Sequence, residues 1–435
     1  MPKNPPIVVP VSMLDTDLYK VDAQLNAPAS QADVIVSAPK LTMQQAVLHH
    51  FPDVQATYKF THRDKDVPFT RECIDTFRAA ITEFSALAIT KEELQWLQKS
   101  CPYFKPAYLA HLETYRFKPE QVSVRFTPTS DDGQWGNVEI EATGPWHETI
   151  MWEVPLMACL SELYFTTVDT DWIGDGQYDI ASDKARALLG ADCAFSEFGT
   201  RRRRSFHTQD VVVQALVATA ATMPGQGKVS GTSNVYLAMK HGIAPVGTIA
   251  HEWFMAVGAL KGYEHANATA LNLWEEVYPN VLLVALTDTF STGAFFKDFV
   301  ADPERARRWT GLRQDSGDPF EFAPKAKAMY ESVGIAPHEK SIIFSDALNL
   351  DKALRLKKQC DEIGFKAAFG IGTYLTNDFQ KASTSGKEKS KALNMVIKIA
   401  SVDGKTCVKI SDDLKKNTGD SAEVRKVKEI FGLPQ

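Results

Sequence analysis

The chain contains 435 residues, and its 48 basic and 54 acidic side chains leave a formal net charge of −6. This length predicts two or three domains, or one α/β barrel with an additional domain. The acidic balance argues against a nucleic-acid partner. With 44% hydrophobic residues and only 25 glycines and 22 prolines, the composition is that of a globular protein rather than a disordered or fibrous one.

Nothing in the sequence predicts a membrane span or an exported protein. The longest central apolar run covers residues 281–286, far short of the roughly 18 residues that cross a bilayer. Residues 7–9 are apolar but are followed by Pro10, which does not fit a secretory signal. The six cysteines show no C-x-x-C pair, which is typical of reduced thiols. We therefore expect no membrane partner, no disulfides and a cytoplasmic location, with a nuclear one also open.

The first 150 residues mix helical and extended patterns and predict an N-terminal α+β domain. Helices are predicted over 71–88 and 91–100, and strands over 121–127 and 137–142. Residues 21–40 are atypical, being rich in alanine, proline, serine and glutamine, and we expect a loop or a disordered segment there.

Residues 151–390 alternate short apolar runs with helical periodicity, the pattern of βαβ units and a parallel sheet. Six or seven such units predict a nearly closed α/β barrel as the catalytic domain. The predicted strands are 193–198, 228–231, 245–249, 281–287, 309–313, 341–344 and 367–370. The predicted helices are 205–222, 265–277, 319–332 and 350–363.

The parallel pattern stops after residue 391. Two apolar segments, 393–400 and 407–410, flank Asp403-Gly404, a dipeptide typical of tight β-hairpins. We expect this C-terminal segment, 391–435, to pack back on the N-terminal α+β domain.

Polar residues and glycines follow the predicted strands of the barrel, where ligands bind in parallel α/β folds. They are Thr232-Ser233-Asn234, His251, Asp288, Arg313, Asp315, Asp346 and the Gly-x-Gly of residues 370–372. Carboxylates suit Mg²⁺ and ribose, arginines suit phosphate, and glycines allow close backbone approach. Each signal alone is weak, because a Gly-x-Gly often serves a turn and a lone histidine often has a structural role. Together they favour an enzyme with a phosphorylated ligand.

Residues 201–204 are four consecutive arginines in an acidic chain. They could form a solvated first turn of a helix, where four cations would oppose the helix macrodipole. The alternative is that an anionic partner offsets their repulsion.

Six segments carry a resemblance to a known family. They are DTDLYK (15–20), SEFGTRRRRS (196–205), GTSN (231–234), GTIAHEW (247–253), RQDSGDP (313–319) and FGIGT (369–373). In order and spacing, from about residue 15 to 420, they resemble nicotinate phosphoribosyltransferases of the fungal type. The resemblance implies the type II phosphoribosyltransferase fold, an incomplete α/β barrel with an α+β domain, in a homodimer with shared active sites. It also implies ATP-coupled synthesis of nicotinate mononucleotide and pyrophosphate from nicotinate and 5-phosphoribosyl-1-pyrophosphate, which leads to NAD.

The resemblance also implies roles for individual residues. His251 would be phosphorylated by ATP, the co-substrate, since a neutral imidazole has the lone pair that attacks phosphorus. Asp315 and Asp346 would lie near the ribose and Mg²⁺. Phe198 would stack on the pyridine ring, with Tyr19 of the other subunit on its opposite face.

Further implied roles concern the anionic groups of the substrates. Arg313 would face the nicotinate carboxylate, a pairing that suits a guanidinium. Phosphate or pyrophosphate contacts are implied for Lys20, Arg201, Gly370, Gly372 and Thr373. Ser233 would set specificity, because related nicotinamide-specific enzymes carry an aspartate there, which would repel a carboxylate.

Two alternatives stay open at this point: a phosphoribosyltransferase for nicotinamide or another pyridine base without obligatory ATP coupling, and a non-catalytic sensor of phosphoribosyl ligands. Residues 21–40 depart from the family pattern, in which the Tyr-Lys of the first motif leads almost directly into a helix beginning here near Thr42. A retained in-frame intron is one hypothesis for this segment. It would either displace Tyr19 and Lys20 from the partner's site or loop out into solvent.

Overall fold

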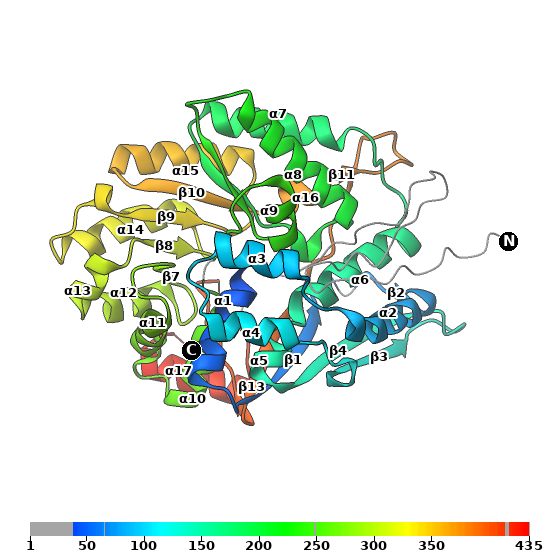
Figure 1. The fold of residues 1–435 in the computed structure, drawn as a ribbon, viewed down its shortest axis with the longest axis horizontal. Helices are drawn as coiled ribbons and strands as arrows, with labels where there is room; N and C mark the ends of the chain where they lie inside the picture. The colour runs from blue at the N-terminus through cyan, green and yellow to red at the C-terminus, as the bar shows by residue number, and fades with distance from the viewer. Residues whose placement is uncertain (1–37, 65, 248, 414–416, 435) are drawn as a thin grey trace.

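Six parallel strands in the second half of the chain form one sheet, in the order β6–β5–β10–β9–β8–β7. The computed structural model describes residues 38–64, 66–247, 249–413 and 417–434 (Figure 1). The strands are β5 (Ala194–Glu197), β6 (Lys228–Thr232), β7 (Val284–Leu286), β8 (Gly311–Gln314), β9 (Ser341–Phe344) and β10 (Lys366–Ile371). Because β6 and β7 lie at opposite ends of the sheet and do not pair, the barrel is incomplete, as the resemblance implied.

Completely buried apolar side chains, which the register places on a shared face of the sheet, explain why these short runs form central strands. Phe195, Leu312, Ile342 and Phe344 are completely buried, and the rings of Phe344 and Phe369 stack with centroids 5.9 Å apart. Such strands are covered by helices on their faces.

The helices predicted in this half are confirmed. They are α8 (Phe206–Ala221), α11 (Ala266–Val277), α14 (Pro319–Glu331) and α15 (Leu350–Ile363). The Asn349 side chain caps α15 by accepting a hydrogen bond from the backbone N–H of Lys352.

Two strand predictions need correction. Of the strand predicted over 245–249, residues 245–247 and 249 are described and are not a strand, because Pro245 lacks an N–H and makes only one isolated bridge, to Thr232. The strand predicted over 281–287 is confined to β7, since Val281 is exposed and Leu282 has a φ of 55°, outside the extended region.

The second sheet is antiparallel and combines both ends of the chain. Its order is β14–β13–β1–β4–β2, with β3 also paired to β4. The strands are β1 (Gln55–His62), β2 (Phe69–Thr70), β3 (Val122–Pro128), β4 (Trp135–Pro145), β13 (Met395–Val402) and β14 (Lys405–Thr406). The turn between β13 and β14 is the predicted hairpin turn, with positive φ values of 44° at Asp403 and 74° at Gly404. Its second strand is Lys405–Thr406, whereas the predicted segment 407–410 makes only one isolated bridge, from Lys409 to Thr418.

The remaining helices surround the two sheets. They are α1 (Ala38–His50), α2 (Arg71–Glu83), α3 (Lys91–Ser100), α4 (Pro106–Thr114), α5 (Trp146–Thr149), α6 (Glu153–Thr167), α7 (Gln177–Gly190), α9 (Val235–His241), α10 (His251–Lys261), α12 (Thr292–Val300), α13 (Pro303–Arg308), α16 (Thr373–Thr376) and α17 (Ser421–Phe431); β11 (Phe379–Gln380) pairs with β12 (Lys389–Ser390). Because α1 begins at Ala38, the last residues of the 21–40 segment are helical rather than a loop. The helix predicted over 71–88 ends at Glu83 and continues as a 3₁₀ turn, Phe84–Ala86.

A layer of aromatic side chains joins the two sheets. It consists of Phe51, which follows α1, and of one tryptophan from each of α5, α10 and α11, namely Trp146, Trp253 and Trp274. The centroids of neighbouring rings lie 5.6 to 6.1 Å apart. The three tryptophans are completely buried. Among the described residues, no helix has the length and apolar character needed to cross a bilayer.

Candidate active site

Two adjoining cavities lie where the parallel sheet meets the antiparallel sheet. The larger, which we call the cationic pocket, has a volume of about 310 Å³ and is lined by Arg63, Phe198, Gly199, Arg201, Arg202, His251, Arg313, Asp315, Ser345, Asp346, Ala347, Leu348, Gly370, Gly372, Thr373, Val396, Lys398 and Lys409. The smaller, the inner pocket, has a volume of about 140 Å³ and is lined by Pro39, Lys40, Met43, Glu153, Val154, Phe198, Thr200, Arg201, Ser233, Ala250, His251, Arg313 and Asp315. Five residues line both, so the two pockets are parts of one site.

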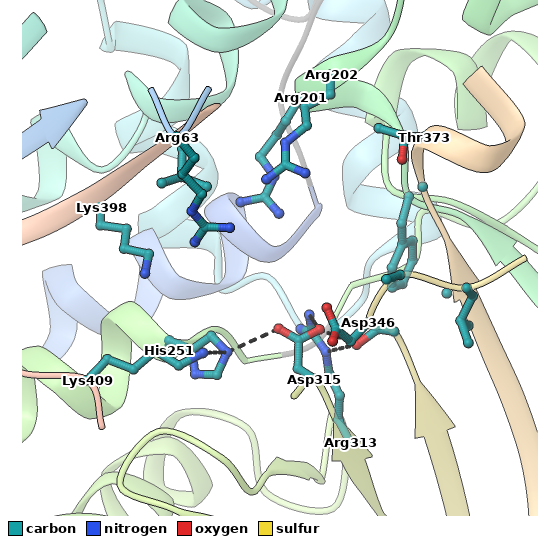
Figure 2. A pocket seen from close by; sticks show the side chains of 18 residues that line it. Arg63, Arg201, Arg202, His251, Arg313, Asp315, Asp346, Thr373, Lys398 and Lys409 are labelled. Atoms are coloured by element: carbon teal, nitrogen blue, oxygen red, sulfur yellow. Dashed lines mark hydrogen bonds and ion pairs between the residues drawn. The ribbon is translucent and has the colours of Figure 1, made fainter. Parts of the chain in front are cut away.

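The ends of the parallel strands place most of these side chains (Figure 2). Phe198 follows β5, Arg313 and Asp315 lie at the end of β8, and Asp346 follows β9. The carboxyl ends of parallel strands meet at one edge of a sheet, which brings these distant positions together. Every described residue to which the family resemblance assigns a role lines one of the two pockets. Of the other strand-end residues expected at the site, Thr232, Asn234 and Asp288 are completely buried and line neither pocket. Tyr19 and Lys20 lie outside the described residues.

The first glycine of the Gly-x-Gly serves the packing of the aromatic residue at the site. A Cβ atom on Gly370 would lie 2.4 Å from the ring of Phe198, so only glycine lets this ring lie against β10. Gly372 and Thr373 follow β10 and also line the cationic pocket. The Gly-x-Gly therefore serves both the packing of Phe198 and the shape of the cationic pocket.

His251, the first residue of α10, is held by groups on both ring nitrogens. Its Nδ1 lies 3.0 Å from Thr289 Oγ1, and its Nε2 lies 3.1 Å from Asp315 Oδ2 and 2.8 Å from Lys409 Nζ. Burial and the charge of Lys409 lower the pKa of His251 below its ordinary value, despite Asp288 and Asp315 nearby. The imidazole is therefore neutral at pH 7 and keeps a nucleophilic lone pair.

Asp315 connects the ends of three elements. Its Oδ1 accepts hydrogen bonds from Arg313 Nη2 at 3.1 Å and Ser345 Oγ at 2.5 Å, while Oδ2 faces His251. Burial alone would raise the pKa of this carboxyl, but Arg313 and His251 hold it well below its usual range. The group is thus a permanent carboxylate that aligns Arg313 and His251.

Cations of the antiparallel sheet complete the cationic pocket, and sequence reasoning missed them. Arg63 follows β1, Lys398 lies on β13, and Lys409 follows β14. Burial, followed by the charges of Lys409 and Arg63, lowers the pKa of Lys398 to about 7. No spacing pattern distinguishes these three residues from ordinary surface cations. The pairing of β13 with β1 brings Lys398 and Arg63 to the site, and Lys409 lies beyond β14, in an isolated bridge with Thr418.

The four consecutive arginines divide between the site and the core. Arg201 Nη1 lies 2.8 Å from Glu153 Oε1, and Arg202 also lines the cationic pocket. Arg203 and Arg204 are completely buried, and the Arg204 guanidinium lies 3.7 Å from the centre of the Phe165 ring. The solvated helical turn considered above is therefore wrong, because α8 begins only after the run and Glu153 is the anionic partner of Arg201.

Ser233 faces the inner pocket from the loop after β6. It is 8% exposed, and its Oγ lies 3.3 Å from Thr200 Oγ1. Its backbone is fixed on both sides, since its N–H donates to Glu197 O at 2.8 Å and its carbonyl accepts from Ala38 N at 3.0 Å. The inner pocket thus combines the Phe198 ring, a neutral hydroxyl and the Arg313 guanidinium.

The carboxylates of the site suit a cation that shares its coordination with a ligand. Among the described residues, no three His, Cys, Asp or Glu side chains form a group able to hold a metal by themselves. Asp315 and Asp346 both line the cationic pocket. Mg²⁺ commonly binds through one or two carboxylates together with substrate phosphates, so this donor set fits that ion.

Comparison with known proteins points to one family. The profile of the nicotinate phosphoribosyltransferase (NAPRTase) family matches residues 193–435, and that of its N-terminal domain matches residues 38–161. A Schizosaccharomyces pombe relative named probable nicotinate phosphoribosyltransferase is 42% identical over 428 residues, 98% of each chain. The Saccharomyces cerevisiae nicotinate phosphoribosyltransferase is 39% identical over 434 residues, 98% of this chain and 95% of the relative. A solved structure from Saccharomyces cerevisiae superposes with a TM-score of 0.90 at 37% identity and covers 98% of this chain and 100% of that one.

Proposed function

Because the chain belongs to the nicotinate phosphoribosyltransferase family, we propose that it joins nicotinate to 5-phosphoribosyl-1-pyrophosphate. The pyridine nitrogen bonds to C1 of the ribose as the bond from C1 to the pyrophosphate oxygen breaks, and pyrophosphate leaves with the electron pair. The products are nicotinate mononucleotide and pyrophosphate. The observation that carries this proposal is the junction of an aromatic inner pocket with a pocket of convergent cations.

The inner pocket suits nicotinate. The Phe198 ring provides a face for the flat pyridine, and the guanidinium of Arg313 can pair with the carboxylate. Ser233 adds no negative charge to this pocket. These features favour nicotinate, which carries a carboxylate, over nicotinamide, which carries an amide in its place.

The cationic pocket suits the phosphate groups of the other substrate. Arg63, Arg201, Arg202, Lys398 and Lys409 all line it and can neutralise the pyrophosphate as its charge develops. Backbone N–H groups near Gly372 and Thr373 offer a place for the 5′-phosphate on the opposite wall. Catalysis would thus consist of positioning and electrostatic stabilisation, with no side chain attacking the sugar.

ATP coupling through His251 is part of the proposal. A ring nitrogen of His251 would bond to the γ-phosphorus of ATP as the bond to the bridging oxygen breaks, so that ADP leaves and later hydrolysis releases phosphate. The neutral imidazole among cations supports this step. Mg²⁺, held by Asp315 and Asp346 with substrate phosphates, would offset phosphate charge when bound.

Two further parts of the proposal concern assembly and location. We infer a homodimer in which Tyr19 and Lys20 reach the partner's site, as the family resemblance implies. A cytoplasmic location agrees with six cysteines that are all buried and free. Cross-linking of the purified chain and fractionation of cells test these two points.

One assay tests the catalytic proposal. Formation of the mononucleotide is measured from nicotinate and from nicotinamide, each with and without ATP. We expect product from nicotinate, stimulated by ATP, and little from nicotinamide. Equal rates on both bases would refute the substrate assignment, and absence of turnover on either base would favour a non-catalytic sensor.

A further inference from the structure

The first turn of α1 forms a wall of the inner pocket. Pro39 and Lys40 line this pocket, and Ala38 donates its backbone N–H to the carbonyl of Ser233 at 3.0 Å. Lys40 is only 5% exposed. A lysine buried this deeply needs ionic partners.

Lys40 is the centre of a buried chain of charges. Its Nζ lies 2.6 Å from Glu153 Oε2 and also bonds to Glu252 Oε2. The other oxygen of Glu153 accepts from Arg201 Nη1 at 2.8 Å. The other oxygen of Glu252 accepts from the Tyr58 hydroxyl and, at 3.1 Å, from Trp146 Nε1. Two cations thus balance two carboxylates, and every oxygen of both carboxylates has a donor.

The chain of charges runs from a buried end to an exposed one. The side chains of Lys40 and Glu153 are 6% and 10% exposed, whereas that of Arg201 is 49% exposed and reaches into both pockets. A long arginine side chain loses conformational entropy when it is fixed, so its orientation depends on the anchor it finds. Glu153 is that anchor, and Lys40 fixes the opposite oxygen of the same carboxylate.

We propose that Lys40 is a positioning residue of the site. It holds Arg201 toward the cationic pocket through the carboxylate of Glu153, to which both side chains bind. This role rests on the proposed function, because the anion to be bound is pyrophosphate. Lys40 does not itself need to touch the anion. It acts by keeping Glu153 charged and in place.

The sequence around the atypical segment supports the same role. Lys20 immediately precedes residues 21–40, and Lys40 is the last residue of that segment. A chain lacking 21–40 would join Lys20 to Leu41, so a lysine would again precede the run Leu41-Thr42-Met43. The residue before Leu41 is thus a lysine with or without the segment.

A double-mutant cycle with inorganic pyrophosphate as the probe tests the proposal. Calorimetry on the full chain gives Kd for the wild type, Lys40→Met, Arg201→Gln and the double variant, with circular dichroism to confirm folding. We expect Lys40→Met to weaken binding about tenfold in the wild type but less than about twofold when Arg201 is already absent. Equal losses in both backgrounds, no loss at all, or no binding by the wild type would overturn the proposal.

Two further variants guard against a purely structural effect. Lys40→Arg keeps the positive charge and is expected to retain most of the wild-type affinity for pyrophosphate. A loss as large as that of Lys40→Met would count against the proposal. Lys99→Met, at an exposed position of α3, is the matched control in the full chain and should leave Kd unchanged, whereas a loss equal to that of Lys40→Met would overturn the proposal. Because pyrophosphate binding requires no turnover, these outcomes are separate from those of the nicotinate assay.

Discussion

The substitution Ser233→Asp tests how the inner pocket distinguishes nicotinate from nicotinamide. Hydrogen bonds to Glu197 and from Ala38 fix the Ser233 backbone on both sides, so the new carboxylate cannot withdraw by moving the chain. It must point into a pocket of about 140 Å³, which in the proposed function also receives the substrate carboxylate.

The expected cost follows from simple electrostatics. Two like charges about 4 Å apart repel by roughly 4 kcal/mol at an effective dielectric constant of about 20. Arg313 and Arg201 line the same pocket and offset part of this repulsion. A net loss of about 1–3 kcal/mol remains, the usual scale for a mismatched buried polar group, and corresponds to a fall of roughly 5-fold to 150-fold in kcat/KM for nicotinate.

The assay compares kcat/KM for nicotinate and nicotinamide in Ser233→Asp and in Ser233→Asn, which has the same shape without the charge. We expect a large loss for nicotinate in the aspartate variant, a small one in the asparagine variant, and a shift in preference toward nicotinamide only in the former. If both variants lose nicotinate activity equally, shape rather than charge determines the effect. If Ser233→Asp leaves nicotinate activity unchanged, Ser233 has no part in specificity.

Four further predictions concern other parts of the site. His251→Asn should abolish stimulation by ATP while ATP-independent turnover continues, and a variant that ATP still stimulates would contradict the phosphorylation step. Lys398, with a pKa of about 7 in the free protein, is charged below that pH and neutral above it. The affinity for pyrophosphate should therefore fall from pH 6 to pH 8, and binding at pH 8 should take up a proton. Calorimetry in two buffers detects this proton uptake, which should be absent in Lys398→Met. Burial opposes ionisation of Glu153, but Lys40 and Arg201 lower its pKa from 4.5 to about 2. Its contribution of about 3 kcal/mol to the free energy of unfolding is therefore present above pH 4.5 and lost as the pH falls toward 2. Urea unfolding at pH 5 and pH 2.5 should show this loss of stability, and the loss should be smaller in Glu153→Gln. Phe198→Leu should raise KM for nicotinate roughly 3-fold to 10-fold through lost stacking while KM for the phosphoribosyl substrate stays unchanged in the same kinetic assay.

The parallel half of the fold could be predicted well because its signals are local. Strands such as β9 and helices such as α15 are apolar runs or amphipathic stretches with turn residues and caps at their ends. The errors arose where tertiary contacts override local pattern. Residues 245–249 are apolar enough for a strand, yet a Cβ atom on Gly247 would lie 2.3 Å from Pro39, so this segment packs against α1 instead of extending the sheet.

The site divides in the same way. Asp315, Asp346 and Arg313 could be predicted because each lies at a strand end, and the topology of a parallel sheet brings such ends together. Arg63 and Lys398 could not, because their role depends on the pairing of β1 with β13, elements more than 300 residues apart in sequence. No local sequence pattern identifies a cation that is far from the other site residues in the sequence but close to them in the fold.

Both sheets contribute side chains to the site. The parallel sheet positions Phe198, Arg313 and Asp315, whereas the antiparallel sheet supplies Lys398 and Arg63. Lys409, which follows β14, lies 2.8 Å from His251 Nε2, so the two sheets meet at the histidine itself. Because an ion pair or a hydrogen bond weakens steeply with distance, a small displacement of one sheet against the other would weaken the contact of His251 with Lys409, whose charge is second only to burial in lowering the pKa of this histidine. The tryptophan layer that joins the sheets therefore supports the chemistry as well as the fold.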